Sequence, residues 1–255
     1  ATRSGVEQRI LRRLFTPEDA ALALSLTLLA EEPHVIARRA GCTPEEAAQR
    51  LEAMENKGLI FGIHKPDRRP RYAAQQFVVG IWEFQVNRLN EDLVRLVDAY
   101  LPYLLDVEAW KKAPQLRTIP VGESVKMPSE VMTYESAEQL IVAKDRFAVQ
   151  PCLCRQEKQL VGEGCGKPLE VCLSMDGAAD FAVRHQNGRM ITREEAVGVL
   201  KIADRAGLVL QPGNIQDPNF ICCCCGDCCG VLRTVKLHPH PAEILSSAFY
   251  AACDQ

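Results

Sequence analysis

Apolar positions spaced by about one helical turn predict helices in the first part of the chain. The segments TPED at 16–19 and TPEE at 43–46 each combine a hydroxyl cap, a proline in the first turn and acids near the positive end of the helix dipole. After the second segment, Ala47, Leu51 and Met54 recur at spacings of 4 and 3, so they share one helix face. Helices are therefore expected to begin near residues 16 and 43.

Short apolar segments around these helices complete a recognisable order of elements. A short helix is expected over 33–40, just before the helix that begins at 43. The segment 59–61 and Tyr72 are expected to form two strands around the loop HKPDRRPR, residues 64–71. Helices followed by such a hairpin predict a winged helix-turn-helix domain over residues 1–75.

The rest of the chain divides into a helical connector and a mixed domain. Apolar residues spread through 76–114 predict further helix, so this stretch is interpreted as a helical connector. Residues 115–255 carry short apolar strands at 147–149, 208–210 and 220–221. Between them, Thr192 and Glu195 form a capping box for a helix. The expected fold class is α+β.

Composition and charge indicate an ordinary globular protein. Of 255 residues, 47% are apolar and 25% are charged, and the net charge of −3 gives no general reason to expect a polyanion as partner. The longest apolar stretch, 20–30, is interrupted by Ser25 and Thr27 and is shorter than the roughly 20 residues of a membrane span. The first residues lack the apolar core of a signal peptide. We therefore expect a cytoplasmic protein without a membrane span.

Cysteine is the unusual component, with 12 residues grouped in the second half of the chain. The first 151 residues contain only Cys42, and Cys253 stands alone near the other end. Neighbouring cysteines are poor disulfide partners because a bridge requires specific Cβ positions. A core of ordinary size also needs no disulfide staples. Metal or iron–sulfur binding in a reducing compartment is the better interpretation.

The first cysteine segment, residues 151–173, has the spacing C-x-C-x10-C-x6-C. Four thiolates suit a [4Fe–4S] cluster, and they equally suit tetrahedral zinc. Arg155 and Lys158 supply positive charge beside the thiolates, and the glycines at 162–166 allow backbone amides to approach a cluster. These details favour iron, and they make Arg155 and Lys158 candidate cofactor-binding residues.

The second segment, ICCCCGDCCG at 221–230, holds six cysteines within eight residues. One mononuclear zinc site needs at most four sulfurs, so this number exceeds a single site. Adjacent residues of an extended chain point to opposite faces. The pairs 224/225 and 228/229 are therefore expected to serve two sites on either side of a strand. Each segment holds its own cluster in this arrangement only if it supplies all the ligands. The alternative is that the two segments share ligands.

The sequences PCLCR, GCGKPLEVCL and ICCCCGDCCG resemble a family of ferredoxin-like [4Fe–4S] binding proteins from anaerobic bacteria and archaea. The resemblance covers residues 8–255. In that family the second segment tends to carry asparagine where this chain has Cys223, so the resemblance implies that Cys223 is not a ligand. Family members commonly continue into two C-x2-C-x2-C-x3-C-P motifs, which are absent from this sequence. The chain is either a shorter relative or lacks its ferredoxin tail, so functions that depend on those motifs are not inferred from the resemblance.

Together these features predict one or two [4Fe–4S] clusters and one-electron transfer between redox partner proteins. An electron carrier or an oxidoreductase subunit is favoured over a stand-alone enzyme, because the sequence shows no base–nucleophile pair, Rossmann fingerprint or P-loop. The candidate ligands are Cys152, Cys154, Cys165, Cys172, Cys222, Cys224, Cys225, Cys228 and Cys229.

A redox-sensing transcriptional regulator with an iron–sulfur or zinc site is the alternative function. The helix expected from residue 43 to 57 carries four acids and two bases, which disfavours entry into the major groove of DNA. The wing loop at 64–71, with four bases, favours nucleic-acid binding. Protein docking or homodimer formation is the use we expect for the N-terminal domain.

Overall fold

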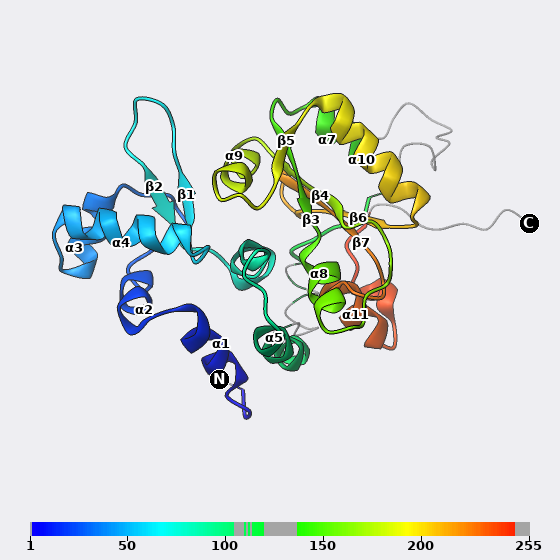
Figure 1. The fold of residues 1–255 in the computed structure, drawn as a ribbon, viewed down its shortest axis with the longest axis horizontal. Helices are drawn as coiled ribbons and strands as arrows, with labels where there is room; N and C mark the ends of the chain where they lie inside the picture. Colours follow the sequence, from blue (N-terminus) through cyan, green and yellow to red (C-terminus); the bar gives the residue numbers. More distant parts are fainter. Residues whose placement is uncertain (1, 105–109, 111, 113, 120–136, 248–255) are drawn as a thin grey trace, which may run out of the picture. The chain divides into compact units, whose positions relative to one another are not determined.

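The computed structural model describes residues 2–104, 110, 112, 114–119 and 137–247 (Figure 1). The chain forms two compact units, Ala1–Tyr100 and Leu101–Gln255. Both contain helices and strands, so the α+β fold class is confirmed. The boundary between the units falls within the stretch predicted as a connector.

The first unit contains a set of short helices and one hairpin. Its elements are α1 (Val6–Leu14), α2 (Pro17–Ala23), α3 (Pro33–Ala40), α4 (Pro44–Asn56), β1 (Phe61–Ile63) and β2 (Arg71–Ala73). The two helix-start signals are confirmed, since the hydroxyls of Thr16 and Thr43 accept the backbone N–H of Asp19 and Glu46 at 3.1 and 3.2 Å. β1 and β2 pair antiparallel, as the hairpin prediction requires. The assignment to the winged-helix class stays a prediction.

The core of this unit forms where the apolar faces of the helices meet the hairpin. Ala47, Leu51 and Met54 are buried on one face of α4, as their spacing predicted. They pack with Leu22, Ile36 and Tyr72. Burial of this set provides the main stabilisation of the unit.

The prediction of further helix over residues 76–114 is only partly right. Two single turns, Phe77–Ile81 and Glu83–Gln85, precede the long helix α5 (Glu91–Leu104). The backbone at Val78 and Val79 is extended, and Gly80 adopts φ 165° and ψ −110°, so no regular helix can run through them. Helix α5 begins where the side-chain oxygen of Asn90 accepts the N–H of Leu93 at 3.0 Å.

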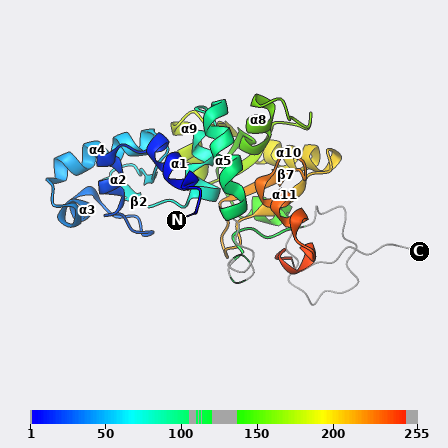
Figure 2. The same cartoon turned by 90° about the horizontal axis from the view of Figure 1, so that it is seen from below.

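The second unit is a five-stranded antiparallel sheet with helices around it (Figures 1 and 2). Its strand order is β5-β3-β4-β7-β6. Its elements are α7 (Ala137–Val142), β3 (Phe147–Pro151), α8 (Leu153–Leu160), β4 (Glu170–Met175), α9 (Gly177–Arg184), β5 (Arg189–Ile191), α10 (Arg193–Arg205), β6 (Val209–Pro212), β7 (Phe220–Cys224), α11 (Gly230–Leu237) and a final turn, Pro241–Glu243. The three predicted strands and the Thr192–Glu195 capping box are confirmed.

The two faces of this sheet differ in chemistry. One face carries apolar side chains such as Phe147, Leu173 and Ile221, which pack against α7 and α10 in the main core. Because side chains alternate along a strand, the intervening residues point to the other face. There Ala148 packs against α9. That face also holds apolar residues at Met190, Val209 and Phe220, and its polar and thiol positions are Gln150, Cys172, Ser174, Gln211, Cys222 and Cys224.

Candidate metal centre

The first cysteine segment folds as a strand end, a helix and a returning strand. Cys152 follows β3 and is the cap residue of α8, and Cys154 lies in the first turn of that helix. The backbone N–H of Cys152 donates to the carbonyl oxygen of Leu169 at 2.8 Å, which holds the return of the loop. Cys172 lies in β4, opposite Gln150 of β3. This geometry brings three cysteines of the segment to one end of the sheet.

The second segment begins as β7 and ends in a tight turn before α11. Cys222 and Cys224 share one face of β7, and Cys223 points to the other. Cys229 is the cap residue of α11, and its N–H donates to the carbonyl oxygen of Cys225 at 3.1 Å. The ammonium of Lys236 donates to the oxygen of Gly226 at 3.0 Å and closes over the turn.

Six thiols from the two segments form a closed ring, which we call the thiol ring. Each thiol interacts with two others, because strand β7, strand β4 and the starts of α8 and α11 meet at this place. The ring runs Cys152, Cys154, Cys229, Cys224, Cys222, Cys172 and back to Cys152.

The direction of the pKa shift alternates around the thiol ring. Interactions with the thiols of Cys172 and Cys224 lower the pKa of Cys222 to about 5. Neighbouring thiols likewise lower the pKa values of Cys152 and Cys229. Interactions with neighbouring thiols, together with burial, raise the pKa values of the other three members, Cys154, Cys172 and Cys224. The thiolate is the form of cysteine that binds a metal.

Two helices begin at the thiol ring. Cys152 precedes α8 and Cys229 precedes α11, so both sulfurs lie at the positive end of a helix dipole. The backbone amides of Arg155 and Leu232, in the first turns, contribute to the lowered pKa values of the two cysteines. The helix starts therefore stabilise negative charge on the ring.

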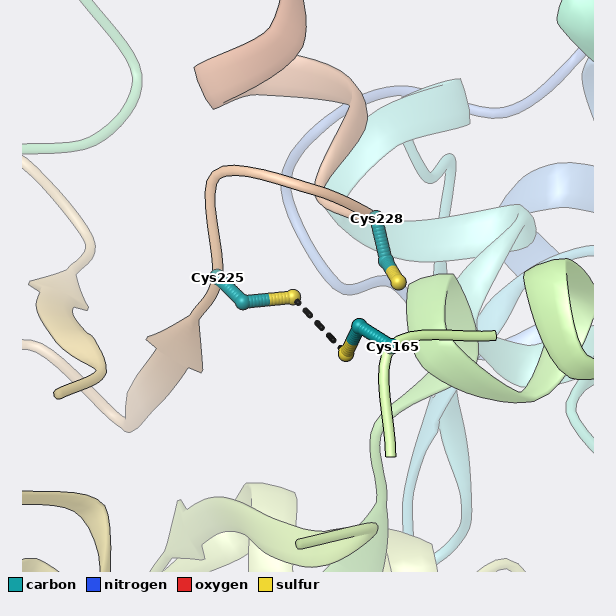
Figure 3. A group of neighbouring side chains, drawn as sticks. All are labelled: Cys165, Cys225 and Cys228. Carbon is teal, nitrogen blue, oxygen red and sulfur yellow. Dashed lines mark hydrogen bonds between the residues drawn. The ribbon is translucent and has the colours of Figure 1, made fainter. Parts of the chain in front are cut away.

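Three further thiols form a separate group, the thiol triad of Cys165, Cys225 and Cys228 (Figure 3). Their sulfurs all lie within 4.8 Å of one another, and the sulfurs of Cys165 and Cys225 are 3.8 Å apart. Cys225 and Cys228 stand at the two ends of the turn after β7. Cys165 comes from the loop after α8, where Gly166 adopts a positive φ of 70° that reverses the chain.

The triad thiols differ in acidity. Burial opposes ionisation of Cys225, but the backbone amide of Cys228 and the guanidinium of Arg155 outweigh it, so the pKa of Cys225 is lowered. Burial raises the pKa of Cys228 to about 12, and its neighbours Cys165 and Cys225 add to this effect. The nine cysteines predicted as ligands thus divide into six and three, and both groups draw on both segments. Such groups could hold metal.

The other cysteines lie apart from these groups. Cys223 is 1% exposed among apolar core residues, opposite Leu210, and burial raises its pKa. Cys42 packs against the core of the first unit. Cys253 lies outside the described residues.

The two predicted cofactor-binding cations are placed differently. Arg155 is only 3% exposed and donates through Nη1 to the carbonyl oxygen of Cys223 at 3.1 Å. Its Nε and Nη2 have no close hydrogen-bond partner among the described residues. Burial disfavours its charge, but the thiolates of Cys152 and Cys225 raise its pKa. Lys158, also buried, forms an ion pair with Glu163 at 3.0 Å.

Gln211 was not predicted from the sequence to be a site residue. It is 1% exposed, pairs with Cys222 in the β6–β7 register, and its Oε1 has no partner among the described residues. Paired residues of neighbouring strands share a face, so the amide lies on the thiol-ring side of the sheet. Gln211 comes directly after the strand expected at 208–210, and only the register relates it to Cys222.

The described helices include none with the length and apolar character that crossing a membrane requires. Comparisons with family profiles, with curated proteins and with solved structures found no match to this chain.

Proposed function

We propose that the thiol ring binds an iron–sulfur cluster and that the protein transfers single electrons between redox partner proteins. The observation that carries this proposal is the number and arrangement of the thiols. Six sulfurs in a ring exceed the four that one zinc ion accepts. A polynuclear cluster takes one thiolate per iron and so suits sulfurs that surround a larger space.

The surroundings of the ring also suit a cluster. Cys152, Cys224 and Cys229 are buried, whereas Cys154, Cys172 and Cys222 are partly exposed. A bound cluster would supply the one-electron chemistry, and the chain would set its reduction potential through burial and amide donors. The starts of α8 and α11 favour negative charge, and the amide of Gln211 lies on the same face of the sheet. The partly exposed side of the ring is where we place electron entry.

The resemblance to ferredoxin-like [4Fe–4S] proteins supports the same proposal. The ring uses Cys152, Cys154 and Cys172 of the first motif together with three cysteines of the second. Cys223, at the position where the family tends to carry asparagine, lies outside the ring. A [4Fe–4S] cluster would use four of the six ring thiols.

The test is the iron, zinc and acid-labile sulfide content of protein purified without oxygen, together with its visible spectrum. We expect about four irons with matching sulfide in the ring and reversible bleaching by dithionite. Cys172→Ser should lose this iron, sulfide and colour. Cys223→Ala is the matched control, because it removes a buried cysteine of β7, in the same sheet, that does not belong to the ring. Absence of sulfide in the native protein would sink the proposal, and so would unchanged iron when Cys152, Cys154 and Cys172 are all replaced by serine, because fewer than four ring thiols then remain.

A redox-sensing regulator remains the second candidate because of one surface feature. Lys65, Arg68 and Arg69 are exposed on the loop between β1 and β2, as a basic wing would be. Against this, Glu45, Glu46 and Glu52 are exposed on α4. A winged-helix first unit with this charge pattern suits docking of a protein or a second copy of the chain better than DNA. Gel-shift assays with its own promoter and light scattering of the purified protein distinguish these roles.

A further inference from the structure

The thiol triad differs from the thiol ring in how its sulfurs are spaced. In the described part of the chain, Cys165, Cys225 and Cys228 are the group of three whose ligand atoms all lie within 4.8 Å of one another. Each ring thiol interacts with its ring neighbours. Among the described residues, however, no three ring thiols have sulfurs that all lie within 4.8 Å of one another. The triad sulfurs are thus mutually close, whereas the ring thiols interact only with their two ring neighbours.

The spacing of the triad fits one tetrahedral metal ion. Sulfurs bound to a single zinc ion at about 2.3 Å lie about 3.8 Å apart in tetrahedral geometry. The sulfurs of Cys165 and Cys225 are 3.8 Å apart. In a [4Fe–4S] cluster each thiolate binds a different iron, so the sulfurs are spread more widely. We propose that Cys165, Cys225 and Cys228 form a mononuclear site for one thiolate-binding divalent ion of the Zn²⁺ class, separate from the ring.

The fourth coordination position of this ion is open to an external ligand. The described residues bring three ligand atoms together at the triad. Cys223 is not in the group, and Asp227, within the turn itself, is exposed. Closed structural zinc sites use four protein ligands, whereas a site with three leaves a position for water or another small ligand. The chemistry that would occupy it is a soft or neutral donor, such as a thiol or water.

Arg155 balances the charge of such a site. Three thiolates and one divalent ion carry a net charge of −1, and burying an uncompensated charge is costly. The guanidinium of Arg155 is buried beside Cys225, and Cys225 and Cys152 both interact with it. Its Nε and Nη2 have no close partner among the described residues and are available to the site. The structure thus provides one positive charge where one negative charge would form.

The experiment compares metal content in two matched variants of the full chain grown with added zinc. Cys228→Ser removes a triad ligand, and Cys172→Ser removes a ring ligand. We expect Cys228→Ser to lose one metal ion per chain with no loss of acid-labile sulfide. Cys172→Ser should lose iron and sulfide and keep that ion. Cys165→Ser is a second triad variant in case Cys228→Ser fails to fold.

X-ray absorption at the zinc edge tests the open position. We expect three sulfurs at about 2.3 Å and one oxygen or nitrogen, with the light atom replaced by sulfur when 2-mercaptoethanol is added. Four sulfurs before addition, or loss of sulfide in both triad variants, would overturn the proposal. The result is independent of the cluster proposal, because a chain without any sulfide would still show whether the triad binds one ion.

Discussion

The unit Ala1–Tyr100 and the unit Leu101–Gln255 satisfy their buried polar groups in different ways. In the first, buried Asp19 bonds Lys57 at 2.7 Å and buried Glu55 bonds His64 at 2.8 Å. In the second, Arg155 and Gln211 are as deeply buried, yet atoms of both have no partner among the described residues. Buried polar groups are normally hydrogen-bonded. The unpartnered atoms of Arg155 and Gln211 belong to side chains that lie beside cysteines, and those cysteines could hold a metal.

Metal removal should produce the largest difference in stability between the two units. Stripping bound metal with a strong chelator under anaerobic conditions should destabilise the second unit, since thiolate–metal binding contributes on the order of 10 kcal/mol in small zinc domains. Hydrogen exchange should then show lost protection in α8 and α11 and unchanged protection in α4. Equal loss of protection in α4 would show that the units do not differ in this way.

Replacement of Arg155 should have the next largest effect. Arg155→Met leaves buried thiolates without their cation, and breaking a buried charge pair costs about 3–5 kcal/mol. We expect a lower unfolding free energy in urea and weaker metal retention during dialysis. Arg155→Lys keeps the charge and should recover part of both. A methionine variant as stable as the native protein would show that the guanidinium does not compensate the thiolates.

Neighbouring residues of β4 offer a comparison within the second unit. Leu173 packs in the apolar core and Cys172 belongs to the thiol ring. Leu173→Ala should cost about 2–5 kcal/mol of unfolding free energy because it creates a cavity, with the metal content unchanged. Cys172→Ser should do the reverse and lose iron with little change in packing. Loss of metal in Leu173→Ala would mean that the two faces of the sheet are not independent.

An acid titration of the first unit should give the smallest effect. Arg39 donates to both carboxylate oxygens of Glu31, which lowers the pKa of Glu31 from 4.5 to about 2. The carboxylate is therefore stabilising above pH 4.5, and this contribution is lost as the pH falls from 4.5 through about 2. Native protein should be more stable than Glu31→Gln at pH 6, and the difference should shrink by pH 3. A constant difference in urea unfolding would contradict the ion pair.

Local signals in the sequence predicted much of the fold. The caps at Thr16, Thr43 and Thr192 lie where predicted, because capping depends on residues within one turn. The helix expected through Val78 and Gly80 failed, since two β-branched residues and a glycine favour extended backbone there. The pairing of β4 with β7 was not predicted, because strand partners are distant in sequence.

The division of the cysteines illustrates the same limit. Spacing in sequence grouped Cys165 with Cys152, Cys154 and Cys172, but the loop between α8 and β4 carries Cys165 to the triad. Alternation along an extended chain suggested that residues 224 and 225 serve different sites, and the structure places Cys224 in the ring and Cys225 in the triad. Alternation is a local property of the backbone, whereas the path of a loop is not.

The mixed origin of the thiol ring has a consequence for how the protein is made. Cys152, Cys154 and Cys172 are synthesised before Cys222, Cys224 and Cys229, yet each half of the ring needs the other for its neighbours. Until β7 and the start of α11 have emerged and folded, the early thiols have no complete site. If the ring holds a cluster as proposed, loading would follow translation of residue 229, and until then the first three thiols would be open to oxidation and to binding another metal.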